Sequence, residues 1–506
     1  MKKKSTLKKL IRSLLFTLCL SFIVSVSHAQ ITKILSNDST SVGYFGNFVD
    51  ISGDYAIVAA TDGNGVRPAA YIFFRSDSGW IQQAKIETKD IVGSYGGIGS
   101  VAISGDYAIV ASSSKDTDIR GEGVVYVFKR NGENWILNST LKSGDYPSSG
   151  SFLFGHRIDI LGDYILVGGS GYYDSGFPSN QSVVHIFKRR ANGWSLTQKI
   201  DVTSWGDFRF GREVFLSNNY ASVLIDYTSG RVNGIEGINS AIYMSRRDGN
   251  RWVEDGLIRI DDDEKEEIVQ FAESDGNVVV ISNTRDGHSL YSFKKINGIW
   301  SKTSKTSINR SDTNWILSMD VHKDQLIIGG YINVEEYGIP DYEERGVVLL
   351  YKYFGNTWNQ VYIIEAIDGE QGKEERGDFG KSVAISENYA IIGDPREGSS
   401  SYHQRGAAYV CDISSLLITG NEDITNKPFN IYPNPNNGTF AVHFENTLLT
   451  DNEIIVSDIS GRIVKKLLIK KGQQNFKINL SDLNKGLYIL RFVDSEKVYS
   501  SSIIIE

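Results

Sequence analysis

A nine-residue peptide, ISGDYAIVA, occurs twice in this chain, at residues 51–59 and 103–111. An identical copy 52 positions away indicates an internal repeat, which constrains a fold more strongly than any single motif. The same frame recurs in less similar form around Asp163, Asn219, Asn277, Asp324 and Asn388. Seven units, spaced by 47 to 64 residues, therefore fill most of the chain.

Each unit contains four short apolar segments. The first alternates apolar and polar residues, and Gly-Asp or an equivalent pair separates it from the second, as at Gly53-Asp54. Such a pair predicts a tight hairpin turn. The third segment has the form GVVYVF, and the fourth begins with a tryptophan after a turn: Trp80, Trp135, Trp194, Trp252, Trp300 and Trp358. Four short strands repeated at this period predict the blade of a β-propeller, with the first strand nearest the axis.

The seventh unit has no tryptophan segment, and the missing strand is predicted at the other end of the chain. Lys33-Ile34 precede Asp54 by the same 21 and 20 residues that separate Lys85-Ile86 from Asp106. We therefore expect residues 31–35 to pair with the last unit and remove its open edge. The predicted fold class is all-β: a seven-bladed propeller closed by an N-terminal strand, followed by a small C-terminal β-sandwich.

The first 29 residues have the pattern of a secretory signal peptide. Six basic residues precede a short apolar run, and Ser27-His28-Ala29 offers a cleavage site near Ala29. The remaining chain has 47 Lys and Arg against 61 Asp and Glu, a net charge of −14, which argues against nucleic acid and anionic membranes as partners. We expect no transmembrane segment in the mature chain. Its single cysteine, Cys411, is expected to be a buried apolar residue.

Residues 31–417 resemble FG-GAP repeats, the units of the integrin α-subunit propeller. The resemblance rests on Phe-Gly pairs such as Phe45-Gly46 and Phe379-Gly380, followed by ISGDYAIV-like and GVVYVF-like segments. It implies the propeller fold. Calcium-binding members carry a DxDxDG loop in the first hairpin, whereas this chain has only Ser-Gly-Asp-Tyr there. The family's calcium site is therefore not expected, and no metal or other cofactor is predicted.

The connection between the second and third segments carries a carboxylate in every unit. The candidate binding residues are Asp62, Asp116, Asp174, Asp226, Asp286 and Asp394, with Glu335 or Glu336 in the sixth unit. All would emerge on one face, flanked by Tyr172, Tyr173, Tyr227 and Tyr337. One interpretation is an acidic, aromatic rim that binds an extracellular protein or glycan partner. The other is a set of ordinary solvated loops.

Signatures of the common hydrolases are absent from the sequence. It contains no HExxH, no CxxC pair, no Gly-x-Ser-x-Gly and no phosphate-binding glycine loop, so no catalytic residue is predicted. The sequence favours a binding protein for adhesion or surface assembly over an enzyme. The alternative is an extracellular polysaccharide-active enzyme whose paired carboxylates come from different blades.

The repeat ends near Leu417, and a polar linker, 418–427, leads to a different pattern. Residues 428–506 contain YPNPNNG, VSDISGRIV and LNKGLYILRF. These motifs resemble the type A C-terminal sorting domain of the type IX secretion system of Bacteroidetes. The motif residues are Tyr432, Pro433, Asn434, Pro435, Gly438, Asp458, Gly461, Arg462, Gly486 and Tyr488. The resemblance implies recognition by the type IX machinery, followed by secretion or attachment to the outer-membrane surface.

Overall fold

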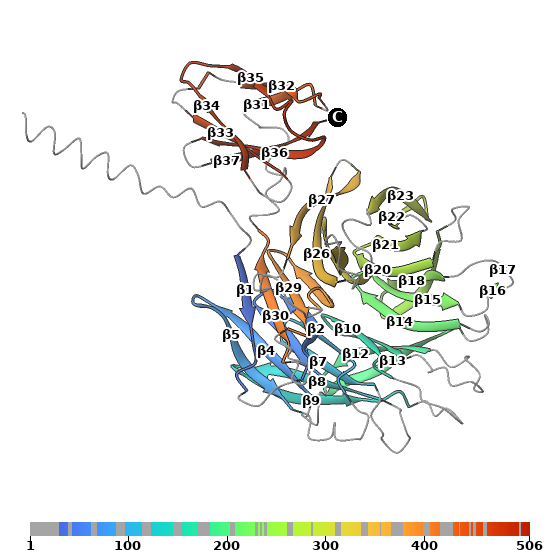
Figure 1. Cartoon of the computed structure of the whole chain (residues 1–506). Coiled ribbons are helices and arrows are strands. Elements are labelled where there is room, and N and C mark those ends of the chain that lie inside the picture. The colour runs from blue at the N-terminus through green and yellow to red at the C-terminus, as the bar shows by residue number, and fades with distance from the viewer. Residues whose placement is uncertain are drawn as a thin grey trace, which may run out of the picture.

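The computed structural model of the chain is built from β-strands (Figure 1). It describes residues 30–38, 43–61, 68–87, 97–113, 123–144, 154–169, 183–202, 208–227, 231–232, 235–236, 240–260, 267–284, 287–308, 315–334, 343–354, 356–365, 378–397, 405–414, 429–434, 436–444, 447–448, 452–458, 463–494 and 497–505. These residues contain no helix, and hence none that could cross a membrane. The all-β prediction is confirmed.

Residues 30–412 contribute seven four-stranded antiparallel sheets, each of which corresponds to one sequence unit. The first sheet contains β2 (Phe45–Ser52), β3 (Tyr55–Ala60), β4 (Ala69–Ser76) and β5 (Gly79–Ile86). The second contains β6 (Ser100–Ser104), β7 (Tyr107–Ser112), β8 (Val124–Asn131) and β9 (Asn134–Leu141). The third contains β10 (Arg157–Leu161), β11 (Tyr164–Gly169), β12 (Val183–Arg190) and β13 (Gly193–Asp201).

The remaining sheets follow the same order. The fourth contains β14 (Phe208–Leu216), β15 (Tyr220–Tyr227), β18 (Ser240–Asp248) and β19 (Arg251–Ile258), with the small pair β16 (Arg231–Val232) and β17 (Ile235–Glu236) inserted. The fifth contains β20 (Glu267–Ser274), β21 (Asn277–Thr284), β22 (Gly287–Ile296) and β23 (Ile299–Ile308). The sixth contains β24 (Trp315–His322), β25 (Gln325–Val334), β26 (Glu343–Phe354) and β27 (Thr357–Ile364). The seventh contains β28 (Ser382–Ser386), β29 (Tyr389–Asp394), β30 (Ala407–Asp412) and β1 (Gln30–Ile34).

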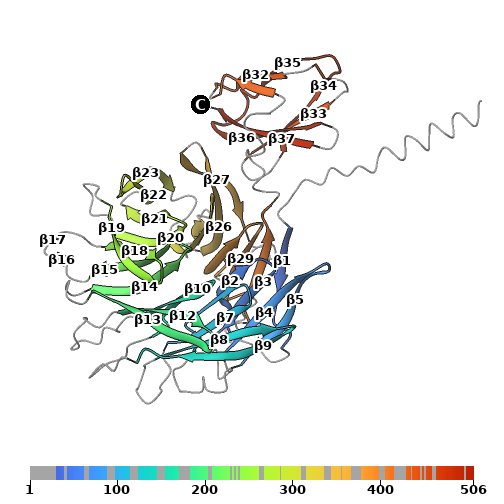
Figure 2. The same cartoon turned by 180° about the vertical axis from the view of Figure 1, so that it is seen from behind.

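The N-terminal strand completes the seventh sheet. β1 pairs antiparallel with β30, from Gln30 opposite Asp412 to Ile34 opposite Ala408. Figure 1 shows blue β1 beside orange β30, and Figure 2 shows β1 beside an orange strand from behind. The predicted pairing of the two ends of the repeat is thus observed. Cys411 lies in β30 and is fully buried, as expected.

The first strands of the seven sheets form a closed circuit. Each contacts the first strand of the next sheet: β2 with β6, β6 with β10, β10 with β14, β14 with β20, β20 with β24, β24 with β28, and β28 with β2. Buried apolar clusters lie between neighbouring sheets and take residues from both. Each sheet therefore covers the apolar faces of its neighbours. This arrangement is compatible with the predicted propeller.

The copied peptide forms the first hairpin of its sheet. Ser52 pairs with Tyr55, and Gly53 at the turn has φ +58°; Gly105 and Gly162 have φ +56° and +58° at equivalent turns. A positive φ favours glycine, which explains why this residue recurs. One expected anchor is wrong: Asn277 is the first residue of β21, and Asp275-Gly276 form that turn, because the fifth unit is shifted by one residue.

A tyrosine and a tryptophan connect neighbouring sheets near these turns. Tyr55 of the first sheet packs edge-to-face on Trp135 of the second, with ring centroids 5.9 Å apart. The same contact recurs in four further pairs, Tyr107–Trp194, Tyr164–Trp252, Tyr220–Trp300 and Tyr389–Trp80. The repeated tryptophan thus fastens its own sheet to the preceding one.

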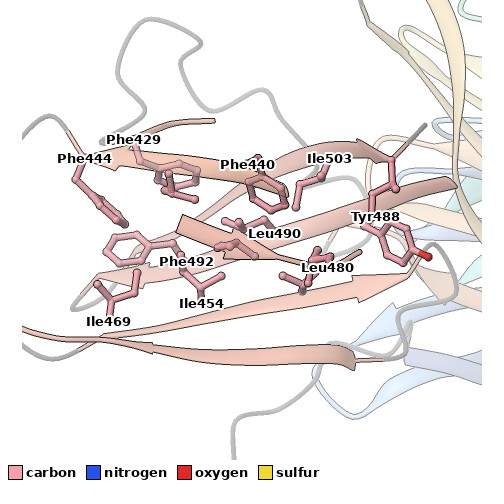
Figure 3. Packing of buried hydrophobic residues seen from close by; sticks show 14 of the residues in the cluster. Phe429, Phe440, Phe444, Ile454, Ile469, Leu480, Tyr488, Leu490, Phe492 and Ile503 are labelled. Atoms are coloured by element: carbon pink, nitrogen blue, oxygen red, sulfur yellow. The ribbon is translucent and has the colours of Figure 1, made fainter. Parts of the chain in front are cut away.

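Residues 429–505 contribute seven further strands: β31 (Phe429–Tyr432), β32 (Thr439–Phe444), β33 (Asn452–Asp458), β34 (Ile463–Ile469), β35 (Asn475–Asn479), β36 (Gly486–Asp494) and β37 (Lys497–Ile505). They form a three-stranded sheet, β31-β32-β35, and a four-stranded sheet, β34-β33-β36-β37. One apolar cluster draws on both sheets, with Phe444 and Phe492 in contact at 4.8 Å (Figure 3). This shared core makes the two sheets one folding unit.

Candidate functional site

The seven sheets have two unlike ends. We call the end that carries the turns between first and second strands the hairpin face, and the opposite end the loop face. Neighbouring turns contact each other: Gly53 N donates to Ser386 Oγ at 3.2 Å, Gly105 N to Ser52 Oγ at 3.4 Å, and Lys323 N to Ser274 Oγ at 3.1 Å. These contacts place the turns side by side on one face.

The loop face carries the connections in which the sequence predicts a binding rim. These connections differ in span, from 285–286 to 170–182, whereas the turns opposite are short. Most predicted residues lie outside the described residues: Asp62, Asp116, Asp174, Asp286, Glu335, Glu336, Tyr172, Tyr173 and Tyr337. Asp226 and Tyr227 are described only as backbone at the end of β15. The predicted rim therefore stays a prediction at all these positions.

Asp394 is the one predicted carboxylate whose surroundings are described. It ends β29, and its Oδ1 accepts a hydrogen bond of 3.0 Å from the backbone N–H of Asp378. Asp378 in turn accepts from Tyr331 Oη at 2.5 Å and forms an ion pair with Arg396 Nε at 3.1 Å. Burial, together with the charges of Glu397 and Asp378, raises the pKa of Asp394 to about 7.

This pair of carboxyl groups lies inside the protein. Asp394 is 3% exposed and Asp378 is 6% exposed, so neither presents a surface to a substrate. Their partners tie the segment before β28 to the end of β29. The pair therefore organises the loop face, and it lends no support to the alternative of a carboxylate-based enzyme.

Three further carboxylates lie near the axis, and the sequence analysis missed them. Asp50, Asp159 and Asp320 occupy the same position in the first strands of sheets one, three and six. Each accepts one hydrogen bond from the next residue of its own strand, at 2.7 to 2.8 Å. Each accepts a second, at 2.6 to 2.8 Å, from the first strand of the following sheet.

Burial raises the pKa of all three axial carboxyl groups. The pKa rises to about 6 for Asp159 and about 7 for Asp320, and well above its ordinary value for Asp50. Their mutual repulsion adds to the shift of Asp50 and Asp320. The sequence does contain a signal for these three residues, because each lies four residues before the turn aspartate of its unit, Asp54, Asp163 or Asp324. Because both oxygens are occupied by backbone N–H groups, the chemistry of these residues is inter-sheet bridging.

The hairpin face has its own charged pattern. In sheets one to three the turn aspartate pairs with an arginine of the third strand: Asp54 with Arg75, Asp106 with Arg130 and Asp163 with Arg189. The same arginines lie over a tyrosine ring of the preceding sheet, at 4.8 to 5.2 Å from the centroid. The aspartate of the copied peptide therefore positions the arginine that helps join two sheets.

The described sorting-motif residues come together although they are far apart in the sequence. Asn434 Oδ1 accepts from the N–H of Ile504 at 2.8 Å, and the N–H of Asn436 donates to the carbonyl of Ile504 at 2.9 Å. Gly438 accepts from Leu480 N at 2.6 Å, immediately before the LNKGLYILRF segment. The first motif thus binds both the last strand and the turn that precedes β36.

The remaining motif residues are placed as follows. Asp458 pairs through its backbone with Tyr488, whose hydroxyl donates to the carbonyl of Asn484 at 2.8 Å. Tyr432 is 80% exposed, Pro433 directly follows β31, and Gly486 is the first residue of β36. Pro435, Gly461 and Arg462 lie outside the described residues. The structure therefore connects all three motifs through one small region of β33, β36 and β37.

Comparison with protein families agrees with this division of the chain. Residues 430–506 match the secretion system C-terminal sorting domain, and residues 28–73 and 358–411 match the FG-GAP repeat. The first repeat match runs from β1 into β4, and the second runs from β27 to β30. The chain thus carries FG-GAP repeats and a type IX sorting domain, which implies secretion or attachment to the cell surface.

Solved structures give distant likenesses. One is a protein from Lactobacillus plantarum, 10% identical over 84% of this chain and 99% of that one, with a TM-score of 0.42. Another is the complex of KlAtg21 with the coiled-coil of AgAtg16, 11% identical over 84% and 99%, with a TM-score of 0.44. No curated protein matches the chain. None of these likenesses bears on function.

Proposed function

We propose that this chain is an exported binding protein whose loop face contacts an extracellular protein or glycan, in adhesion or surface assembly. The observation that supports it is the contrast between the two faces: the turns of the hairpin face repeat, whereas the connections of the loop face differ from sheet to sheet. Binding sites are common on variable connections that a rigid scaffold positions. The sorting domain supplies the route to the outside.

The scaffold beneath the loop face supports this role. Gly46 has φ +96° and approaches the end of β29 and the start of β30, so closely that a Cβ would lie 2.2 Å from the carbonyl oxygen of Ala407. Gly155, Gly211 and Gly380 of other sheets also have a positive φ, at the same Phe-Gly position. The repeated Phe-Gly pair therefore fixes the base of four of the connections while the connections themselves can change.

Export is tested by removing residues 430–506. We expect the truncated protein to remain in the cell envelope, because the domain that the secretion machinery recognises is lost. Immunoblots of culture medium, surface-exposed protein and periplasm would measure the distribution. The matched control is Asn388→Asp, a turn substitution on the hairpin face that leaves the domain intact. Truncated protein in the medium at the wild-type level would overturn this step.

Binding is tested by exchanging one connection at a time. The exported protein is applied to a glycan array and to surface proteins of the producing cells. We then replace residues 171–181 by a Gly-Ser segment of equal length. We expect retention of the partner to fall with this exchange, and to be unchanged with Asn388→Asp. Equal retention after exchange of every loop-face connection would contradict the proposal.

A further inference from the structure

A surface groove opens on the hairpin face between the fourth and fifth sheets. Its lining includes four basic side chains: Arg246 and Arg247 from β18, and Lys294 and Lys295 from β22. Two carboxylates are near, Asp275 in the lining and Asp255 beneath Lys295. The groove is therefore cationic, although the chain as a whole carries a net charge of −8.

The excess of positive charge arises where the repeat departs from its own pattern. Arg75, Arg130 and Arg189 each face a turn aspartate in sheets one to three. In the fourth sheet Asn219 stands at that turn position, and among the described residues Arg247 has no carboxylate partner. In the fifth sheet the position is Gly276, and Lys295 is paired elsewhere. Two repeats have thus lost the acid that neutralises their cation.

The cations are held in place by contacts with neighbouring groups. Asp255, whose side chain is 8% exposed, accepts from Lys295 Nζ at 2.5 Å and lies 3.6 Å from Arg246 Nε. The Arg247 guanidinium lies over the ring of Tyr164 at 4.8 Å, and its Nε donates to the carbonyl of Gly249 at 3.3 Å.

Lys294 is positioned in the same way. Its Nζ lies 4.9 Å from the ring centroid of Tyr353, which belongs to the sixth sheet. With all four cations positioned before binding, less side-chain entropy is lost when an anion arrives.

The groove also offers neutral polar and aromatic groups. Asn219 and Asn277 supply side-chain amides, and half-buried Tyr220 supplies a ring. Trp300 contacts that ring edge-to-face at 5.3 Å, and a Cβ on Gly276 would lie 3.1 Å from the ring carbon Cε2. Amides bind hydroxyl groups and an aromatic ring packs on a sugar, so the lining suits a glycan better than an acidic peptide.

From these contacts we infer that the groove binds the sulfate or carboxylate groups of an anionic polysaccharide. Arg246 and Arg247 bind the anionic groups with paired N–H donors, and Lys294 and Lys295 add charge. The site is separate from the loop face of the proposed function, so either can fail without the other. Because Arg246 and Arg247 are exposed, binding should weaken as salt is raised.

The experiment measures binding of a heparin hexasaccharide to the full mature chain by isothermal titration calorimetry. Asn219→Asp rebuilds the acid–arginine pair that sheets one to three contain, and Arg247→Gln removes the cation. We expect each to weaken binding about fivefold, the size of one exposed charge interaction. Asn388→Asp and Arg130→Gln make the same changes of charge at other turns and should leave the affinity within about twofold. Circular dichroism checks that each variant is folded.

Two further probes separate the possible ligands. Inorganic sulfate at equal sulfate concentration and poly-glutamate are titrated in parallel, and we expect both to bind more weakly than the hexasaccharide. Absence of hexasaccharide binding, or an equal loss in the matched controls, would overturn the site. Sulfate or poly-glutamate binding as tightly as the hexasaccharide would overturn its assignment to a polysaccharide.

Discussion

The junction between the first and second sheets differs from that between the fourth and fifth, although both come from one repeat. At the first junction Asp50 accepts the N–H of Ile103 at 2.6 Å near the axis. At the other, Phe215 occupies the register position of Asp50 and packs on Phe271, with centroids 5.0 Å apart. A buried polar bridge in one place is thus an aromatic contact in the other.

The same two junctions also differ at the hairpin face. Tyr55 lies between Trp135 and Arg130, and Asp106 pairs with that arginine. Tyr220 keeps its tryptophan, but the equivalent cation, Lys295, binds Asp255 instead. Both junctions therefore keep the tyrosine–tryptophan contact, whereas the carboxylate that pairs with the cation differs between them. The groove lies at this junction, with Lys295 and Tyr220 in its lining.

The largest expected effect is at the aromatic junction. Phe271→Ala removes a fully buried ring and leaves a cavity that its neighbours cannot fill, so we expect the free energy of unfolding to fall by about 3–5 kcal/mol. Asp50→Ala leaves two buried N–H groups without an acceptor and should cost about 1–3 kcal/mol. Urea denaturation followed by tryptophan fluorescence measures both. A larger loss for Asp50→Ala would make the polar bridge the stronger element.

The strand frame could be predicted from the sequence because it depends on local signals. Alternating apolar residues, a glycine turn and a tryptophan lie within each unit, and even β1 was found, since its spacing to Asp54 repeats that of Lys85-Ile86 to Asp106. The predicted fifth turn lies one residue too far along the chain, because Asn277 resembles the turn asparagines of other units. Pattern alone does not separate a turn residue from the first residue of a strand.

The polar contacts could not be predicted in the same way, because their partners lie in other units. The sequence does not identify Asp159 as a bridge between sheets, because its carboxylate accepts a hydrogen bond from the N–H of Leu216 in another unit. Only the folded chain brings Leu216 N to 2.7 Å from Asp159 Oδ2. Asp394 was expected in an exposed rim, but the folded chain buries it against Asp378. The groove depends on the absence of the turn aspartate from the fourth and fifth units. This absence gains a meaning only when the structure shows the aspartate–arginine pairs of sheets one to three.

A smaller effect is expected from the pH dependence of the axial bridges. Burial raises the pKa of Asp320 from 3.8 to about 7, so between about pH 4 and 7 the folded state holds more protons than the unfolded state. The sign follows: this group makes the free energy of unfolding fall as pH rises through that window. Asp320→Asn cannot ionise and should flatten the slope, at a cost of about 1–3 kcal/mol for one lost hydrogen bond.

Urea denaturation of wild type and Asp320→Asn at pH 5, 6, 7 and 8 provides the measurement. The difference between the two proteins isolates the contribution of this group from the other titrating residues. Trp315→Gln, an exposed position in the same strand, serves as the control and should keep the wild-type slope. Parallel slopes for wild type and Asp320→Asn would show that this carboxyl group does not titrate in that window.

The smallest effect concerns the replaceable charges, and it tests the comparison most directly. A double-mutant cycle on Asp106 and Arg130 should give a coupling of about 0.2–1 kcal/mol, the usual range for an exposed ion pair. At the junction between the third and fourth sheets, which also lacks the turn aspartate, Asn219→Asp should create a coupling of similar size with Arg247, which already lies over Tyr164. If the two couplings match, the fourth sheet retains the geometry of the pair and has lost only its charge. If Asn219→Asp gains nothing, the two turns differ in backbone as well, and the cations of the groove are held by Asp255 and the tyrosine rings alone.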